Sequence, residues 1–250
     1  MFRDAQESHR HALQTLNTLY EFDDFMLSIG TLCDMGCGEG LDLAWWAGRT
    51  TRELDNPKPL DIKCTGVDLV NRSKTIENLR GVRYIQQDFE KELPIGPRRF
   101  DVIWCHDAFQ YATNPLNTLR LWNEQINTNG MLYICVPMHI NNVQGRWSME
   151  AWNQEYFSWT PLSLIYALAV NGFDMRDAYM YKAPSDPWLH AVVFKSNLEP
   201  MDPKTTTWHD LSSAGLLHDT VMASIQTFGR PVQNHIVYPW LDHENHYFSA

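Results

Sequence analysis

Residues 31–40 read Thr-Leu-Cys-Asp-Met-Gly-Cys-Gly-Glu-Gly, and this stretch decides the fold class. A short apolar run ends at Asp34, and three glycines follow at alternate positions, Gly36, Gly38 and Gly40. Glycine permits positive φ angles and lets a backbone approach a ligand closely, because it has no Cβ atom. The apolar spacing after the third glycine is helical. A strand, a glycine turn and a helix in this order predict the ligand-binding corner of a doubly wound α/β sheet.

The alternation of strands and helices continues along most of the 250 residues. Strands are predicted at 31–34, 62–69, 82–87, 100–105 and 131–136, and helices at about 41–54, 71–80, 114–126 and 160–172. Two further strands, at 173–181 and 188–195, are joined by a short proline-containing loop, which predicts an antiparallel hairpin. The sequence therefore predicts an α/β fold with a doubly wound, seven-stranded mixed sheet.

The chain divides into a cap, a main domain and an extension. Apolar spacing in residues 1–30 predicts a helical cap, residues 31–196 form the α/β domain, and residues 137–159 are an aromatic insertion within it. Residues 197–250 form a C-terminal extension that the sheet does not require. A helix is predicted there at 211–228, and the extension is expected to pack on the domain or on a second subunit of a homodimer.

Composition limits the classes of partner. The formal net charge is −10 and the longest basic run is Arg98-Arg99, so the chain offers no general attraction to nucleic acid. Five cysteines all fall in predicted strands or strand ends, which is typical of reduced thiols in an intracellular protein. No apolar run approaches bilayer length and no signal peptide opens the chain, so a cytoplasmic location without membrane contact is expected. Potential metal ligands lack ordered spacing, and no metal site is predicted.

The acid two residues before the first glycine indicates the type of ligand. A carboxylate at Asp34 would repel a pyrophosphate, but it suits a ligand that carries an ammonium group. The run Asp-x-Gly-x-Gly-x-Gly resembles the first motif of class I S-adenosylmethionine-dependent methyltransferases, whose cofactor has an amino-acid end and no phosphate. This resemblance covers about residues 10–196, and it implies a Rossmann-like methyltransferase fold with S-adenosyl-L-methionine as the cofactor.

The resemblance also implies which residues bind that cofactor. Asp34 and the glycine turn would hold the methionyl end, and Asp68, at the end of the second strand, would accept hydrogen bonds from the ribose hydroxyls. Asp88 and Phe89 would contact the adenine. Such acids share the sheet edge where parallel strands bind ligands. The predicted cofactor-binding residues are Asp34, Gly36, Cys37, Gly38, Gly40, Asp68, Leu69, Asp88, Phe89 and His106.

The exit of the fourth strand reads Trp-Cys-His-Asp-Ala-Phe-Gln-Tyr, residues 104–111. DNA and protein-glutamine amino-methyltransferases usually carry Asn/Asp-Pro-Pro-aromatic there, and this chain does not. The stretch is more similar to the Asp-Ala-Phe-Leu-His segment of small-amine methyltransferases, with Tyr111 in place of the histidine. The phenol of Tyr111 thus replaces a histidine, which would titrate near neutral pH and could serve as a base. The predicted catalytic residues are His106, Asp107, Tyr111 and His139.

The aromatic insertion is predicted to lie over the cofactor edge, because the fifth strand neighbours the fourth there. Aromatic faces attract cations, so Trp147 and Trp159 are expected to face the acceptor side of the pocket. The alternative for these rings is that they attach the insertion to the domain or to a partner.

Together these observations predict an S-adenosylmethionine-dependent methyltransferase that acts on a small-molecule acceptor, with an amine as the favoured acceptor group. Two alternatives stay open at this point. An NAD(P)-dependent oxidoreductase is opposed by the glycine spacing, because dinucleotide enzymes use GxGxxG. A catalytically silent cofactor-binding or assembly module on the same fold would bind the cofactor without turning it over.

Overall fold

The computed structural model describes residues 28–48, 50, 59–96, 98–138, 157, 159–181, 188–232 and 236. The elements in chain order are β1 (Thr31–Met35), α3 (Leu41–Ala47), β2 (Lys63–Asp68), α4 (Ser73–Ile76), β3 (Val82–Gln86), β4 (Phe100–His106), the 3-10 helix η1 (Phe109–Tyr111), α5 (Pro115–Gln125), β5 (Ile126–Pro137), α6 (Pro161–Val170), β6 (Phe173–Tyr181), β7 (Trp188–Lys195), α7 (Trp208–Ser213) and α8 (Asp219–Phe228). Most of the predicted cap and most of the predicted insertion lie outside the described residues.

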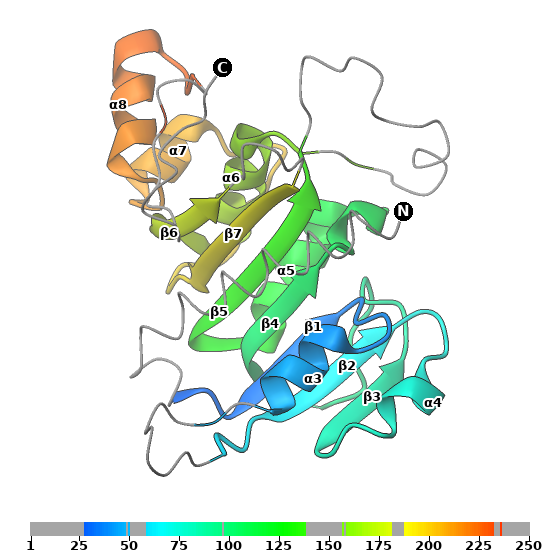
Figure 1. Cartoon of the computed structure of the whole chain (residues 1–250). Helices are drawn as coiled ribbons and strands as arrows, with labels where there is room; N and C mark the ends of the chain where they lie inside the picture. Colours follow the sequence, from blue (N-terminus) through cyan, green and yellow to red (C-terminus); the bar gives the residue numbers. More distant parts are fainter. Residues whose placement is uncertain are drawn as a thin grey trace.

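The strands form one seven-stranded sheet in the order β3-β2-β1-β4-β5-β7-β6. Strands β1 to β5 run parallel, whereas β7 is antiparallel to both of its neighbours, β5 and β6. The strand order reverses between β1 and β4, and a doubly wound sheet binds its ligand at such a switch point, outside the carboxyl ends of the strands. The predicted α/β class and the mixed sheet are confirmed (Figure 1).

Helices cover both faces of the sheet, because successive strand residues point to opposite sides. Leu32 and Trp104 belong to a buried cluster that includes side chains of α3 and α4. Cys33 and Ile103 point the other way, into a larger cluster with α5, α6, α7 and α8. Figure 1 shows α3 on one side of β1 and β2, and α5 on the opposite side of the sheet. These two cores fix the strand ends, and with them the side chains that follow each strand.

Helices α5 and α6 begin where the sequence predicts. The side chain of Asn114 accepts a hydrogen bond from the amide of Asn117, and Pro115 occupies the first helical position. Thr160 and Ser163 form a reciprocal capping box at the start of α6. Caps of this kind stabilise a helix by about 1 kcal/mol each. Because α5 connects β4 to β5, its cap also helps to set the loop that leaves the carboxyl edge of β4.

Two predicted helices are shorter in the structure. Helix α3 ends at Ala47, and Gly48 follows it, whereas the apolar spacing predicted a helix to residue 54. Helix α4 is a single turn, Ser73–Ile76, within the predicted range 71–80. Its polar sequence offers one buried side chain, Ile76, so packing stabilises little more than that turn. No helix in the described part of the chain is long and apolar enough to cross a membrane.

Strand β5 begins five residues earlier than predicted. It was predicted at 131–136, after an Asn-Gly turn, but it starts at Ile126 directly after α5. The pairing with β4 shifts register between Phe100 and Val102, and Asn129 has a φ of 61°. The turn predicted at Asn129-Gly130 is therefore an irregularity inside the strand, because neighbouring β4 supplies pairing partners on both sides of it.

The described part of the C-terminal extension, residues 197–232 and 236, packs on the domain of its own chain. The predicted helix at 211–228 is in fact two helices, because Gly215, at a φ of 69°, lies in the turn that separates α7 from α8. The amide of Met175 in β6 donates to the carbonyl of Leu216 at 2.9 Å. The hydroxyl of Tyr166 in α6 donates to the carbonyl of Thr206 at 2.8 Å. Helices α7 and α8 therefore lie beside β6 and α6 (Figure 1).

Candidate functional site

The glycine turn between β1 and α3 is held on β2 and packs against the exit of β4. The amides of Gly36 and Cys37 donate to the carbonyl of Val67 at 2.8 and 3.0 Å. Gly36 has a φ of 80°, and a Cβ atom there would lie 2.3 Å from the Cβ of Ala108. Gly38 has a φ of 50°, but a Cβ atom there would meet no described atom within 4 Å. The first glycine is thus required by packing, whereas the second borders open space.

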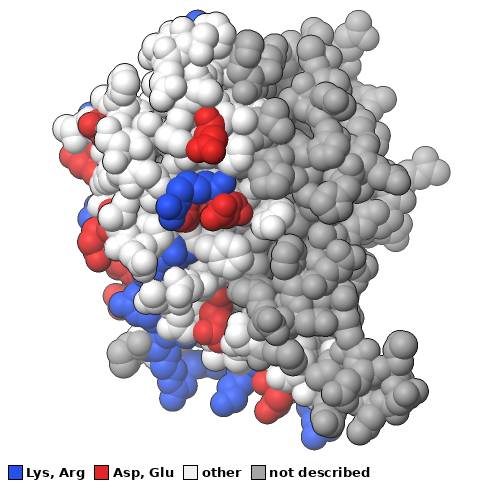
Figure 2. Space-filling view, turned by 90° about the vertical axis from the view of Figure 1, so that its left-hand side faces the viewer, with Lys and Arg blue, Asp and Glu red and all other residues white. Residues whose placement is uncertain are grey.

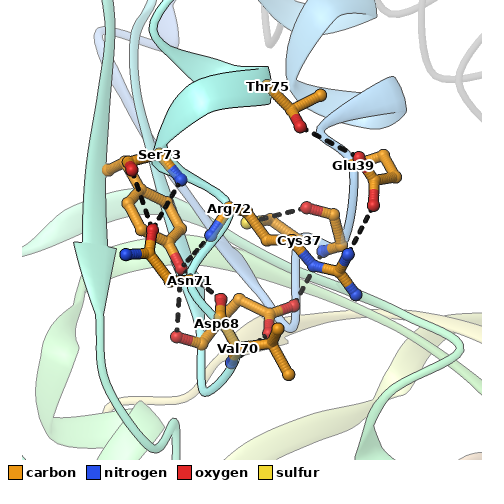
Figure 3. Close-up of polar contacts among 10 residues, drawn as sticks. Cys37, Glu39, Asp68, Val70, Asn71, Arg72, Ser73 and Thr75 are labelled. Carbon is orange, nitrogen blue, oxygen red and sulfur yellow. Dashed lines mark hydrogen bonds and ion pairs between the residues drawn. The ribbon is translucent and has the colours of Figure 1, made fainter.

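Asp68 ends β2 directly beside this turn (Figure 3). Its Oδ2 accepts a hydrogen bond from the amide of Gly38 at 2.9 Å, and its Oδ1 accepts one from the amide of Val70 at 2.8 Å. Each carboxylate oxygen can accept a second bond, because it has two lone pairs. The next two side chains, Leu69 and Val70, are 69% and 54% exposed. A fixed carboxylate and an exposed apolar surface therefore lie side by side.

The loop after Asp68 is fixed by a hydroxyl from β3. The hydroxyl of Tyr84 accepts from the amide of Arg72 at 3.1 Å and donates to the carbonyl of Val70 at 2.6 Å. At the start of α4, the side-chain oxygen of Asn71 accepts from the amide of Ser73 at 3.0 Å. These bonds set the direction in which the Arg72 side chain leaves the loop (Figure 3).

An ion pair joins the glycine turn to α4, and sequence reasoning did not identify it. Nη1 of Arg72 lies 2.5 Å from Oε1 of Glu39, and the hydroxyl of Thr75 donates to the other oxygen of Glu39 at 3.0 Å. The partners come from different loops, so neither helical nor strand periodicity signals them. An acid within the glycine run, at position 39, is the one sequence feature that could have indicated this contact.

Two acids and a histidine lie together beneath the turn. Asp34 is 2% exposed in β1, and Asp42 is 6% exposed in the first turn of α3. Oδ2 of Asp42 is 2.8 Å from Nε1 of Trp104 and 2.8 Å from Nδ1 of His106. Burial alone would lower the pKa of His106, but the hydrogen bond and charge of Asp42, together with those of Cys135, outweigh burial, and the pKa lies well above its usual value.

Asp34 responds to the same surroundings. Burial raises its pKa well above the usual range, and the nearby charges of Asp42 and Asp68 raise it further, while His106 opposes them. A cationic group placed beside Asp34 would offset both the burial and the repulsion between these acids. The chemistry of this corner therefore suits a positively charged ligand group. Asp42 was not among the predicted site residues, because its place in the first turn of a helix is explained by the helix dipole alone.

Asp107 has an unusual backbone and an unusual acidity. Its φ of 54° lies in the left-handed region, its amide donates to the carbonyl of Cys135 at 3.1 Å, and its Oδ1 accepts from Nε2 of Gln110 at 2.5 Å. Burial raises the pKa of Asp107 to about 6, although His106 and Gln110 lower it. Strained backbone and shifted acidity cluster at functional sites. Tyr111, four residues on, is 39% exposed.

The exit of β3 reaches the glycine turn from the other side. The carboxylate of Asp88 accepts from the amide of Glu90 at 3.0 Å, so it is partly engaged in its own turn. The ring of Phe89 lies edge-on to Trp122, with centroids 5.8 Å apart, and its Cδ1 is 3.9 Å from the Cβ position of Gly36. Asp88 and Phe89 thus lie at the same edge as the turn, as predicted from their place after a parallel strand.

Glu90 joins two loops at the site edge, and it was not among the residues predicted from the sequence. Its carboxylate accepts from the amide of Asn114 at 2.8 Å and from the hydroxyls of Thr113 and Thr118 at 2.8 and 3.2 Å. Burial raises the pKa of Glu90, but these hydrogen bonds together lower it by more, so the pKa lies below its usual value. The loops that follow β3 and β4 are therefore held together at the site edge.

The described residues at the C-terminal end of the aromatic insertion, Phe157 and Trp159, contact the exit of β4. The amide of Phe157 donates to the carbonyl of Gln110 at 3.3 Å. Trp159 is 6% exposed and stacks on Phe109, with ring centroids 5.3 Å apart. The expectation that Trp159 faces a methyl acceptor was wrong, because Phe109 covers its ring within the core. The corresponding predictions for His139 and Trp147 lie outside the described residues.

Comparison with known proteins identifies the class. A family model described as a methyltransferase domain matches residues 6–178 of this chain. The chain therefore belongs to this methyltransferase family, and the resemblance to class I S-adenosylmethionine-dependent methyltransferases is confirmed.

One curated relative and two solved structures illustrate the likeness. The chain is 26% identical over 126 residues to the ubiquinone biosynthesis O-methyltransferase of Serratia proteamaculans; this alignment covers 50% of the chain and about half, 49%, of the relative. A Burkholderia thailandensis 1,6-didemethyltoxoflavin-N1-methyltransferase, solved with 1,6-didemethyltoxoflavin and S-adenosylhomocysteine, has a TM-score of 0.54 at 17% identity, over 78% of this chain and 84% of that one. A plantazolicin methyltransferase has a TM-score of 0.56 at 17% identity, over 74% and 84%. At these identities the structural likeness concerns the fold.

Proposed function

We propose that this chain transfers a methyl group from S-adenosylmethionine to a small-molecule acceptor. The observation that carries the proposal is the Asp68 carboxylate, held beside the amide of Gly38 at the switch point of the sheet. Its two oxygens, each with a lone pair left for a ligand, suit the adjacent hydroxyls of a ribose.

The surrounding residues fit the rest of the cofactor. Open space in front of Gly38 leaves room for a ligand along the turn. Leu69 is 69% exposed, and a large apolar side chain beside a fixed carboxylate offers a surface for the face of an adenine ring. We assign Asp88 to the adenine amino group and Phe89 to the ring, as the resemblance implies.

The corner beneath the turn suits the methionyl end. Asp34 and Asp42 are both buried, and one imidazolium, His106, opposes them. An ammonium group would relieve the repulsion between the acids, whereas a pyrophosphate would add to it. This charge pattern favours S-adenosylmethionine over a dinucleotide cofactor.

We assign proton removal to Asp107. When bound, S-adenosylmethionine supplies a methyl group that its sulfonium already activates. The residues of the chain then orient the acceptor, exclude water and take its proton onto a carboxylate oxygen of Asp107. A pKa of about 6 keeps that oxygen ionised at neutral pH and basic enough to accept a proton. His106 has a positioning role in this proposal, because Asp42 holds its Nδ1. We assign contact with the acceptor to Tyr111, and the same role stays a prediction for His139, which lies outside the described residues.

The proposed acceptor is a small molecule that presents an amine. The exit of β4 is similar to that of small-amine methyltransferases, and the net charge of −10 gives no general attraction to phosphate. Figure 2, which shows the side of the molecule that is on the left in Figure 1, has Lys and Arg interspersed with Asp and Glu among the residues that the structure describes. The Burkholderia neighbour is an N1-methyltransferase and the Serratia relative an O-methyltransferase, so the same assay must include hydroxyl acceptors.

Transfer of label from methyl-labelled cofactor tests the acceptor class. The purified chain is incubated with panels of small amines, small phenols, DNA, RNA and protein. Label is expected in a small amine. Label in a macromolecule but in no small molecule would contradict the proposal.

Asp68→Asn is expected to weaken cofactor binding and leave the domain folded. The amide is isosteric with the carboxylate, but it loses the charge and one acceptor oxygen. Hydrogen bonds to a charged group contribute about 1.5–3 kcal/mol, so we expect a Kd for S-adenosylhomocysteine that is about 10- to 150-fold higher. Isothermal titration measures the affinity and thermal unfolding checks the fold. Unchanged affinity would show that Asp68 does not contact the ribose.

A further inference from the structure

The pair formed by Glu39 and Arg72 contributes little to folding. Its side chains are 55% and 34% exposed, and exposed ion pairs stabilise proteins by about 0–1 kcal/mol. Glu39 is nonetheless held at both oxygens, by Arg72 and by the hydroxyl of Thr75. A contact that is well defined and contributes little to stability invites a functional explanation.

The ion pair lies next to the carboxylate proposed to bind the ribose. Asp68 contacts the glycine turn at the amide of Gly38, and Arg72 contacts the same turn at Glu39, the following residue. Asp68 and Arg72 are themselves four residues apart, in the loop held by Tyr84. One guanidinium and two carboxylates thus meet at adjacent positions of the turn (Figure 3).

Arg72 has donors left for a second carboxylate. Its Nε is enclosed and has no hydrogen-bond partner among the residues that the structure describes. A guanidinium carries five N–H donors and binds carboxylates in a two-pronged geometry. Without Glu39, the nearest competing carboxylate in this loop is that of Asp68.

We propose that Glu39 is a positioning residue for the cofactor: it holds Arg72 away from Asp68 and keeps that carboxylate available for the ribose hydroxyls. The inference rests on the ribose role proposed for Asp68. Loss of Glu39 frees Arg72 to pair with Asp68, and the cofactor must then displace this pair in order to bind. Removal of Arg72 as well takes away the competitor.

The test compares Glu39→Gln, the double variant Glu39→Gln/Arg72→Gln, and Glu77→Gln, which removes the same charge from an exposed residue just after α4. The Kd for S-adenosylhomocysteine is measured by isothermal titration at low and at high salt. At low salt we expect Glu39→Gln to raise the Kd about tenfold, the scale of one charge-assisted hydrogen bond. The double variant is expected to return to within about twofold of the wild type, as is Glu77→Gln. High salt is expected to shrink the defect, because it screens a partly exposed pair.

The decisive result is the recovery of S-adenosylhomocysteine affinity in the double variant. If the ion pair had only a structural role, the double variant would bind at least as weakly as Glu39→Gln. A double variant that stays weak, or a Glu39→Gln variant that binds like the wild type, overturns the inference. Asp68→Asn separates this inference from the proposed function. If Asp68→Asn weakens binding and Glu39→Gln does not, only the inference fails; if Asp68→Asn binds like the wild type, the ribose assignment fails and the inference fails with it.

Discussion

Gly38→Val is expected to abolish cofactor binding while the domain stays folded. The φ of 50° at this position is unfavourable for a β-branched residue and costs roughly 1–3 kcal/mol of stability. A Cβ atom there would meet no described atom within 4 Å, so the substitution begins in open space and not against the protein. It would instead fill the space along the turn where the methionyl end of the cofactor is proposed to bind. Titration with S-adenosylhomocysteine measures the loss.

Gly36→Val is the matched control for this prediction. It lies two residues earlier in the same turn, and its Cβ atom would be 2.3 Å from the Cβ of Ala108. Overpacking of about 1–3 kcal/mol adds to the strain of a positive φ, so this variant is expected to lose stability in denaturant unfolding. A Gly38→Val variant that binds with wild-type affinity would show that the turn does not surround the cofactor.

Asp107→Asn is expected to slow methyl transfer by about 10²- to 10⁴-fold, the usual contribution of a general base. With the best small amine from the acceptor panel, the wild-type rate is expected to rise with pH through about 6, where Asp107 ionises. The variant is expected to lose this dependence and to keep its affinity for S-adenosylhomocysteine. A variant that turns over at the wild-type rate would exclude Asp107 as the base.

The same substitution is expected to stabilise the protein at neutral pH. Burial raises the pKa of Asp107 from 3.8 to about 6, so between these values the folded state binds more protons than the unfolded state. Stability therefore falls as pH rises through that window. Asparagine carries no charge, still accepts from Gln110 and tolerates a positive φ. We expect Asp107→Asn to exceed the wild type by about 1–2 kcal/mol at pH 8 and by less at pH 4, after allowance for solvent screening. Denaturant unfolding at both pH values measures the difference.

The fold was predictable because its signals are local. Short apolar runs mark the strands, and the glycines at 36, 38 and 40 all adopt the positive φ angles that their spacing implied. Asp34, Asp68 and Asp88 could be expected at one edge, since the carboxyl ends of parallel strands always share an edge. Where a boundary depended on packing, as at the start of β5 or the division of α7 from α8, local patterns were insufficient.

The direction of individual side chains was not predictable. Trp159 is an aromatic residue at the end of an insertion, and such a residue can belong to a binding surface or to the core. Its stacking on Phe109 shows that it belongs to the core. His106 follows a strand at the site edge, yet its ring turns to Asp42 on α3. The predicted strand ends indicate which residues lie near the carboxyl edge of the sheet, but the packing of neighbouring elements determines where their side chains point.

The sequence by itself determined the class of sheet, the glycine turn and the acids at the strand ends, because each depends on backbone conformation and short-range spacing. Only the tertiary structure decided which charges pair. Glu39 meets Arg72 across 33 residues, and Asp42 meets His106 across 64. Such pairs form because β1 lies between β2 and β4 in the sheet. No local pattern encodes that adjacency, so the partners of these four charged side chains became known only once the strands were in place.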